Sequence, residues 1–366
     1  MDYNRLFFIY IFVLSLCFAI SPFIIHILYK YKVWKQRDEL KIIENQMKKK
    51  PTPRMGGIIF ILGVFFTTLL FNWDRQYTYV PTGVMMMGAA LGATDDILQI
   101  FGRKRAVTTF TDGIKGIVKD SIFRKIINIL LIPWRAYSSL FSGFNSSEGK
   151  ELFPHERIFI YLIISVVVMW WFYFKLDLPG KNELWLPFGM SLTIGWLMIP
   201  FIIGIVFTTT VAVALTDGLD GLLASLAIVS FAAFGIISVL QGAYSLATFC
   251  VTMVGALMAY LYFNIKPARI WMGEVGSVAL GTTLATVAVL LNRPILLIII
   301  GLMYFIDFFS VLIQVYGVKI FHKRLLPIAP IHHWFEKLGW DESKIVVRAF
   351  IVAWVIAVIG VWLSRT

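Results

Sequence analysis

The chain is short of charged residues, which make up only 15% of its 366 residues, whereas hydrophobic residues make up 59%. A soluble domain normally carries about 25% charged residues. Its two cysteines, Cys17 and Cys250, both fall inside apolar runs, so neither a disulfide framework nor a cysteine metal site is expected. The sequence has no Walker A motif and no dinucleotide-binding glycine fingerprint, which excludes the common soluble nucleotide-binding folds. These shortages predict a membrane protein with several spans.

Ten apolar runs are candidates for membrane-spanning helices by the hydropathy criterion. The first run has no basic leader and no small-residue cleavage site, so we expect a first span rather than a removed signal. The sequence therefore predicts an all-α polytopic membrane protein, with about ten transmembrane helices in a single integral membrane domain over residues 1–366. The runs cover residues 6–29, 56–73, 79–94, 157–174, 194–214, 221–240, 244–263, 277–292, 294–317 and 346–364.

Basic residues are unevenly distributed between these runs. Residues 30–54, 97–157, 266–269 and 317–348 together hold 27 of the 33 lysines and arginines. Because cytoplasmic loops carry the excess of basic residues, these segments are expected in the cytoplasm and both termini on the outer side of the membrane. The net charge of +12 is then explained by orientation and by contact with anionic membrane lipids, and no nucleic-acid partner is expected.

The cytoplasmic loop 97–156 is the longest polar interruption of the chain. Within it, residues 121–140 mix apolar side chains with Arg124, Lys125 and Arg135. This mixture favours an amphipathic helix lying in the membrane interface. A spanning helix here is the alternative, but it would reverse the later topology and remove the charge asymmetry.

Acidic residues stand at the ends of three apolar runs. Asp217 and Asp220 lie in Leu-Thr-Asp-Gly-Leu-Asp-Gly, Asp95 and Asp96 are adjacent, and Glu274 lies in Met-Gly-Glu-Val-Gly-Ser. The predicted topology places all of them on the cytoplasmic side. Charges at a membrane usually face a functional polar cavity, and hard carboxylate oxygens shared with phosphates suit Mg²⁺. Helix capping is the simpler alternative for each acid taken alone.

Three further segments combine cations with turn residues. Lys48 to Gly57 carries three lysines, then Pro-Thr-Pro-Arg-Met-Gly-Gly, which indicates a fixed turn bringing a cation toward a site; a plain topology anchor is the alternative. Residues 263–277 place two cations and glycines before a new helix, where backbone N–H groups can approach a phosphate. His332 and His333 could contact phosphate or metal, although a histidine pair in a loop is often only polar surface.

The order of these motifs resembles one family closely, the polyprenyl-phosphate sugar-1-phosphate transferases, in their muramoyl-pentapeptide branch. The resemblance runs from Lys49 to Glu336 and includes Phe-Asn-x-x-Pro-Ala and Pro-x-His-His. It implies ten helices in the bacterial inner membrane and transfer of phospho-MurNAc-pentapeptide from UDP-MurNAc-pentapeptide to undecaprenyl phosphate. Lipid I and UMP are then the products, Mg²⁺ is the cofactor, the site faces the cytoplasm and both termini are periplasmic. A homodimer is a possible assembly, although the sequence does not indicate the oligomeric state.

The same resemblance implies roles for individual residues. Asp95, Asp96 and Asp217 are expected to be catalytic, and Glu274 is expected to hold Mg²⁺ together with Asp217. Substrate contacts are expected from Lys49, Gly218, Asp220, Asn264, His332 and His333.

The sequence departs from the family pattern at several positions. Gln99 stands where a lysine is usual, Arg54 where a threonine is usual, and Glu274 where an aspartate is usual. Val211 and Ala214 replace two asparagines, and Trp334 replaces a third histidine. A transferase for N-acetylhexosamine 1-phosphate, a weakened lipid-binding relative and a transporter are the alternative functions, although transporter sites lie nearer the membrane midplane.

Overall fold

A computed structural model describes residues 3–34, 52–74, 77–101, 154–176 and 181–365. Lys49 and the predicted interfacial helix over 121–140 lie outside these residues. The described part contains nine helices long and apolar enough to cross a membrane, together with the shorter apolar helix α2. The prediction of an all-α, multi-span membrane protein is confirmed.

The ten bundle helices follow the predicted apolar runs closely, apart from the ninth. They are α1 (Tyr3–Lys30), α2 (Ile58–Phe71), α3 (Tyr79–Phe101), α7 (Pro154–Trp170), α8 (Met198–Thr216), α9 (Leu222–Leu240), α10 (Tyr244–Asn264), α11 (Gly273–Leu290), α13 (Leu302–Phe321) and α15 (Glu342–Leu363). A π-helical turn, η4 (Trp171–Lys175), continues α7, and a 3-10 turn, η5 (Gly195–Leu197), precedes α8. A small antiparallel hairpin, β1 (Glu183–Leu186) and β2 (Met190–Thr193), joins α7 to α8.

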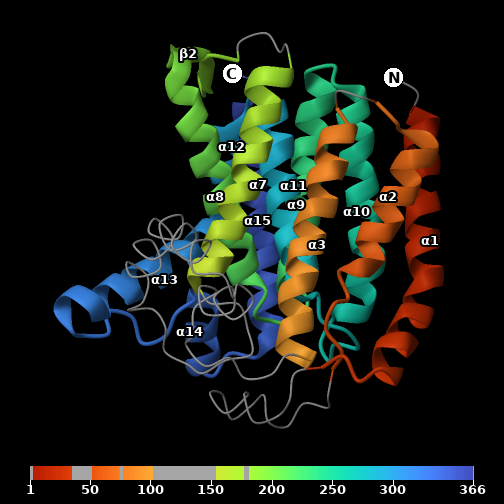
Figure 1. Cartoon of the computed structure of the whole chain (residues 1–366), viewed down its shortest axis with the longest axis vertical. Coiled ribbons are helices and arrows are strands. Elements are labelled where there is room, and N and C mark those ends of the chain that lie inside the picture. The colour runs from red at the N-terminus through yellow and green to blue at the C-terminus, as the bar shows by residue number, and fades with distance from the viewer. Residues whose placement is uncertain (1–2, 35–51, 75–76, 102–153, 177–180, 366) are drawn as a thin grey trace, which may run out of the picture.

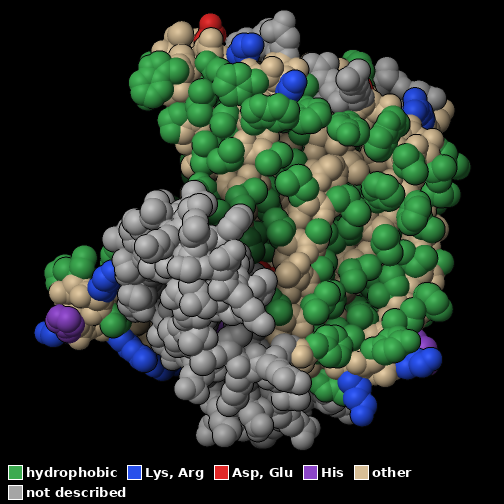
Figure 2. All heavy atoms as spheres, in the orientation of Figure 1, with side chains coloured by type: hydrophobic (Ala, Val, Ile, Leu, Met, Phe, Trp, Pro, Cys, Tyr) green, Lys and Arg blue, Asp and Glu red, His purple; other side chains and the backbone are tan. Residues whose placement is uncertain are grey.

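Helix α11 forms the centre of the bundle. In its apolar stretch 94% of the residues are buried, against 22% for α1 at the periphery, and it contacts α2, α3, α7, α8, α9 and α12 (Pro294–Ile300). The outer faces of the peripheral helices are apolar, and in Figure 2 hydrophobic side chains cover one side of the bundle while lysines and arginines gather near its ends. The apolar exterior is what a protein surrounded by lipid requires.

Both ends of the chain lie at the same end of the bundle (Figure 1). The carboxyl ends of α3 and α8 and the amino ends of α9 and α11 lie at the other end (Figure 1). The acidic motifs of the sequence therefore meet at one end of the bundle, as the predicted topology requires.

The predicted continuous span over 294–317 is wrong, because the helix breaks at Gly301. Helix α12 begins with Pro294, a favourable first residue, and ends at Ile300. A Cβ on Gly301 would lie 2.8 Å from the carbonyl oxygen of Leu297. After the break α13 runs out to the side of the bundle (Figure 1), and the chain returns through α14 (Ile331–Lys337).

Helix α3 is longer than the apolar run that predicted it. It continues to Phe101, so Asp95, Asp96 and Gln99 lie on its last two turns, and all three are buried. Polar residues lower the mean hydropathy and so end the predicted apolar run. They do not end the helix, because their backbone groups make the same helical hydrogen bonds as those of apolar residues.

Glycines allow α3 to lie directly against α11. A Cβ on Gly92 would lie 2.1 Å from the carbonyl oxygen of Glu274, and one on Gly88 would lie 2.7 Å from Oγ1 of Thr282. Gly57, before α2, approaches α11 equally closely, since its Cβ would lie 2.3 Å from Cα of Gly276. Small residues permit such close helix packing in membranes. The contact fixes the acids of α3 beside the start of α11.

Gly92→Ala should therefore destabilise the bundle, whereas Gly83→Ala on the same helix should not. No atom lies within 4 Å of a Cβ on Gly83. Overpacking typically costs about 1–3 kcal/mol, so Gly92→Ala should lower the apparent Tm in detergent and Gly83→Ala should leave it unchanged. Equal Tm values for the two variants would contradict the close contact.

Candidate active site

A short backbone ladder holds the Pro-Arg-Met-Gly-Gly turn against the segment before α11. Trp271 N–H donates to the carbonyl of Pro53 at 2.8 Å, Gly56 N–H donates to that of Trp271 at 2.8 Å, and Gly57 N–H donates to that of Met272 at 3.0 Å. Met55 has a left-handed backbone, with φ of 68°. The turn carries Arg54 to the end of α3, where its guanidinium donates to Oε1 of Gln99.

Asp95, Asp96, Asp217 and Glu274, here called the acid cluster, gather at this end of the bundle. Asp96 is fully buried, and its Oδ2 accepts from the N–H of Val275 at 3.0 Å. The other oxygen, Oδ1, is buried without a hydrogen-bond partner among the described residues, and Arg54 Nε lies 3.9 Å away. This oxygen therefore has hydrogen-bonding capacity that no described residue uses.

Arg157, in the first turns of α7, provides the second cation. Its Nη2 lies 2.7 Å from Oδ2 of Asp95, and its Nη1 lies 3.8 Å from Oε1 of Glu274. Gln99 Nε2 donates to the same Asp95 oxygen at 3.2 Å, and the Tyr161 hydroxyl donates to Oε2 of Glu274 at 3.5 Å. Two guanidiniums thus offset part of the cluster's negative charge.

Asp217 follows α8 and completes the acid cluster. Burial raises the pKa of its carboxyl to about 7; Arg54 lowers the pKa, while the charges of Glu274 and Asp96 raise it further. The N–H of Gly273 also stabilises the charged form. Repulsion between these acids is the electrostatic condition that a bound cation would relieve.

Asp220 and Asn264 hold the backbone around the site. Asp220 Oδ1 accepts from Trp271 Nε1 at 3.0 Å, and its Oδ2 accepts from Ala268 N–H at 3.2 Å. Asn264 accepts from Gly221 N–H at 3.1 Å and donates to the carbonyl of Ile270 at 2.8 Å. These bonds tie the Asp217–Gly221 turn to the segment before α11, so the predicted substrate contacts of both residues would come in addition to a positioning role.

His332 lies in helix α14 rather than in a loop, and it is buried, with 4% of its surface exposed. Its Nδ1 lies 2.8 Å from Oδ2 of Asp307 on α13. Its Nε2 is buried without a partner among the described residues and faces Gly218, whose Cβ would lie 2.2 Å away. His333 is partly exposed, and its Nδ1 lies 2.6 Å from Oε2 of Glu336. Asp307 thus orients one histidine toward the turn that holds Asp217.

Sequence reasoning missed Arg157 and Tyr161. Arg157 carries a usable signal, because a cation in the first turn of a helix opposes the helix dipole and so needs a nearby acid. The acids that Arg157 contacts are Asp95 on α3 and Glu274 on α11, and both lie far from it in sequence. Arg54 stood in the sequence only as a departure from the family pattern, within a segment expected to bring a cation toward a site.

The donor set suits a hard divalent cation. Among the described residues, no three His, Cys, Asp or Glu side chains converge into a preformed metal site. Mg²⁺ commonly uses only one or two carboxylates, with water and substrate phosphates as its other ligands. Oδ1 of Asp96 and the carboxylates of Asp217 and Glu274 could provide such oxygens.

Asp220→Ala and Asp217→Asn should change stability in opposite directions. Asp220→Ala leaves two partly buried donors unpaired, each at a cost of at most about 1–3 kcal/mol, so the apparent Tm should fall. Asp217→Asn removes a repelling charge, so the Tm should stay equal or rise. Thermal unfolding in detergent measures both, and a Tm for Asp220→Ala equal to wild type would remove its positioning role.

Comparison with known proteins gives a consistent result. The family described as Glycosyl transferase family 4 matches residues 77–292, which is more than half of the chain. Proteins named phospho-N-acetylmuramoyl-pentapeptide-transferase are similar over most of their length. The protein of Levilactobacillus brevis is 33% identical over 86% of this chain and 85% of its own. That of Clostridium kluyveri is 33% identical over 93% of each chain, and that of Bacillus cytotoxicus is 32% identical over 94% of each.

Proposed function

The chain belongs to glycosyl transferase family 4 and to the phospho-N-acetylmuramoyl-pentapeptide-transferases, and from this membership we propose its reaction. It transfers phospho-MurNAc-pentapeptide from UDP-MurNAc-pentapeptide to undecaprenyl phosphate and forms lipid I and UMP. The observation that carries the proposal is the acid cluster, in which a buried carboxylate oxygen of Asp96 has no hydrogen-bond partner among the described residues and two arginines lie alongside.

In this reaction an oxygen of the acceptor phosphate attacks the phosphorus that bears the sugar. The bond from that phosphorus to the UMP oxygen breaks, and UMP leaves with the electron pair. Both reactants are anions, so positive charge at the phosphorus lowers the barrier. Arg54 and Arg157 provide that charge from two sides. Asp96 orients the acceptor, since a phosphate with a second pKa of about 6 is mostly ionised at neutral pH and needs little base catalysis.

The acid cluster is proposed to hold Mg²⁺, mainly through Asp217 and Glu274. The ion would neutralise the charge that builds on the phosphates when it is bound. Burial chiefly raises the pKa of Asp217 and the charges of Glu274 and Asp96 raise it further, so a bound cation would favour its charged form. Glu274 is one methylene longer than the usual aspartate, and Arg157 and Tyr161 hold its carboxylate in place.

We propose that the acid cluster faces the cytoplasm of a bacterial inner membrane and that both termini are periplasmic. The charge asymmetry between the loops supports this orientation. A cysteine placed after Thr366 should react with a membrane-impermeant thiol reagent added outside intact cells, and one placed in 103–150 should not. The opposite labelling would reverse the orientation. Contacts with anionic lipids and the homodimer stay predictions.

A transferase for N-acetylhexosamine 1-phosphate is the alternative that uses the same acid cluster. Donor competition separates the two functions. An excess of unlabelled UDP-GlcNAc should not reduce product formation from labelled UDP-MurNAc-pentapeptide, because the Pro-Ile-His-His segment favours the muramoyl-pentapeptide branch.

Release of UMP from UDP-MurNAc-pentapeptide with undecaprenyl phosphate, with and without Mg²⁺, tests the reaction. Asp96→Asn should lower Mg²⁺-dependent turnover by a factor on the order of 100 or more, as losing an electrostatic group at a reacting centre does. Asp341→Asn is the matched control, because Asp341 is exposed at the same end of the bundle and Asn caps a helix equally well. Near-normal turnover of Asp96→Asn would remove Asp96 from the site.

Arg54 is expected to replace the lysine that the family usually has at position 99. Its bond to Gln99 brings a guanidinium to the end of the side chain at position 99. Arg54→Thr should therefore lower turnover by about tenfold to 100-fold, the range for a hydrogen bond to a charged group.

Adding Gln99→Lys to Arg54→Thr should restore much of the lost turnover. Gln99→Lys alone should lower turnover, because it places a second cation against Arg54. A double mutant whose loss equals the product of the two single losses would show that the positions are independent.

A further inference from the structure

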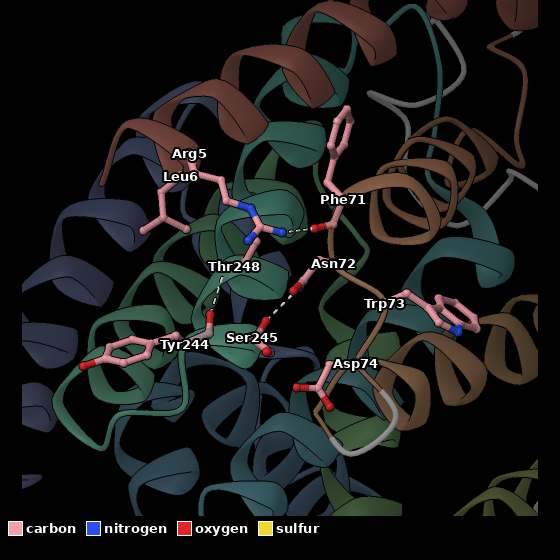
Figure 3. A pocket seen from close by; sticks show the side chains of 9 residues that line it. All are labelled: Arg5, Leu6, Phe71, Asn72, Trp73, Asp74, Tyr244, Ser245 and Thr248. Atoms are coloured by element: carbon pink, nitrogen blue, oxygen red, sulfur yellow. Dashed lines mark hydrogen bonds between the residues drawn. The ribbon is translucent and has the colours of Figure 1, made fainter. Parts of the chain in front are cut away.

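Two cavities lie at the end of the bundle away from the acid cluster. The first, of about 440 Å³, is lined by α1, α2 and α10 (Figure 3). Its polar groups are already engaged: Arg5 donates to the carbonyl of Phe71 at 2.5 Å, Asn72 to that of Ser245 at 2.8 Å and Thr248 to that of Tyr244 at 2.9 Å. Donors that are bonded to the backbone give this cavity little capacity to recognise a ligand.

The second cavity lies between α2, α3 and α7 and has a volume of about 370 Å³. This volume falls in the range of small-molecule sites, about 300–1,000 Å³. Its walls are mainly apolar and are formed by Phe65, Val80, Val84, Met86, Met87 and Val167. Gly83 also lines it, and no atom lies within 4 Å of a Cβ placed there.

Two of the residues that line this cavity, Thr82 and Trp171, each carry a buried hydrogen-bond donor that has no partner among the described residues. Thr82 is only 2% exposed, and its Oγ1 is buried without a partner. Nε1 of Trp171 is likewise buried and unbonded. Trp171 begins the π-helical turn η4, and such turns are frequent at functional sites. Buried donors are normally satisfied, so this cavity suits an apolar ligand that carries acceptor oxygens.

Aromatic residues indicate the depth of the cavity in the membrane. The ring of Tyr79 lies 5.6 Å from that of Trp73 and 5.8 Å from that of Trp171. Tryptophan and tyrosine gather at the headgroup level of a bilayer. Lys175, one turn beyond Trp171, lies with its Nζ 5.1 Å from the ring of Trp170 and adds a cation at the same level.

We propose that this cavity binds one glycerophospholipid of the bilayer leaflet opposite the acid cluster. An acyl chain lies along the apolar wall, an ester carbonyl accepts from Trp171 Nε1, and the phosphate faces Lys175. A polyprenyl chain fits less well, because a hydrocarbon chain has no acceptor to offer Thr82 or Trp171. The ester group therefore distinguishes the two kinds of lipid.

Native mass spectrometry of the full chain in detergent tests the proposal. The protein is titrated with a phosphatidylglycerol and with its diether analogue, which has the same chains but no ester carbonyls. The wild type should bind the diester about threefold to tenfold more tightly, as expected for one hydrogen bond. Trp171→Phe, which keeps the ring and loses the N–H, should bind both lipids equally.

Gly83→Leu should fill the cavity and weaken phosphatidylglycerol binding by at least tenfold. Gly204→Leu is the matched control, because Gly204 also lies in a spanning helix with no atom within 4 Å of its Cβ. Equal binding by the two leucine variants, or an ester preference that survives Trp171→Phe, would overturn the proposal. Displacement of the phospholipid by an equal concentration of undecaprenyl phosphate would also overturn it, and would make the isoprenoid lipid the occupant.

Discussion

Asp96 can reach the backbone N–H of Val275 because Gly92 lets α3 approach the first turn of α11. Any side chain at position 92 would meet the carbonyl of Glu274 and push the two helices apart. The same approach places Asp95 and Glu274 within reach of one arginine. A contact between two glycine-bearing helix faces therefore sets the spacing of the acid cluster, and a change of one methyl group would alter it.

Electrostatic balance is the second constraint on the site. Four acids at the end of an apolar bundle repel one another, and burial adds to the cost of their charges. Arg54 and Arg157 offset this cost from opposite directions, one on a backbone turn and one on α7. Neither guanidinium reaches the free oxygen of Asp96 within hydrogen-bonding distance. The negative charge at this oxygen is therefore only partly offset, and this is where we propose that a cation or a cation–substrate complex binds.

The two ends of the bundle are built for different surroundings. At the end of the acid cluster, backbone ladders and buried carboxylates fix polar groups for chemistry. At the other end, tryptophans and tyrosines surround cavities whose walls are mainly apolar or already hydrogen-bonded. After the break at Gly301, α13 runs out to the side of the bundle, and the chain returns through α14 with His332 facing Gly218. The short helix α14 thus places a histidine against the turn that holds Asp217.

Local composition determined much of this protein. Spanning helices follow from apolar runs, because a helix satisfies its backbone within its own segment, and the acids stood out because charge is costly near lipid. Tertiary structure decided what those acids contact. Three contacts depend on residues that lie far apart in sequence. Arg54 donates to Gln99, Arg157 bridges α3 and α11, and Asp220 accepts from the N–H groups of the segment before α11. The helix break at Gly301 was not predicted either. Hydropathy is averaged over a window, so it does not detect a change of helix direction within an apolar run.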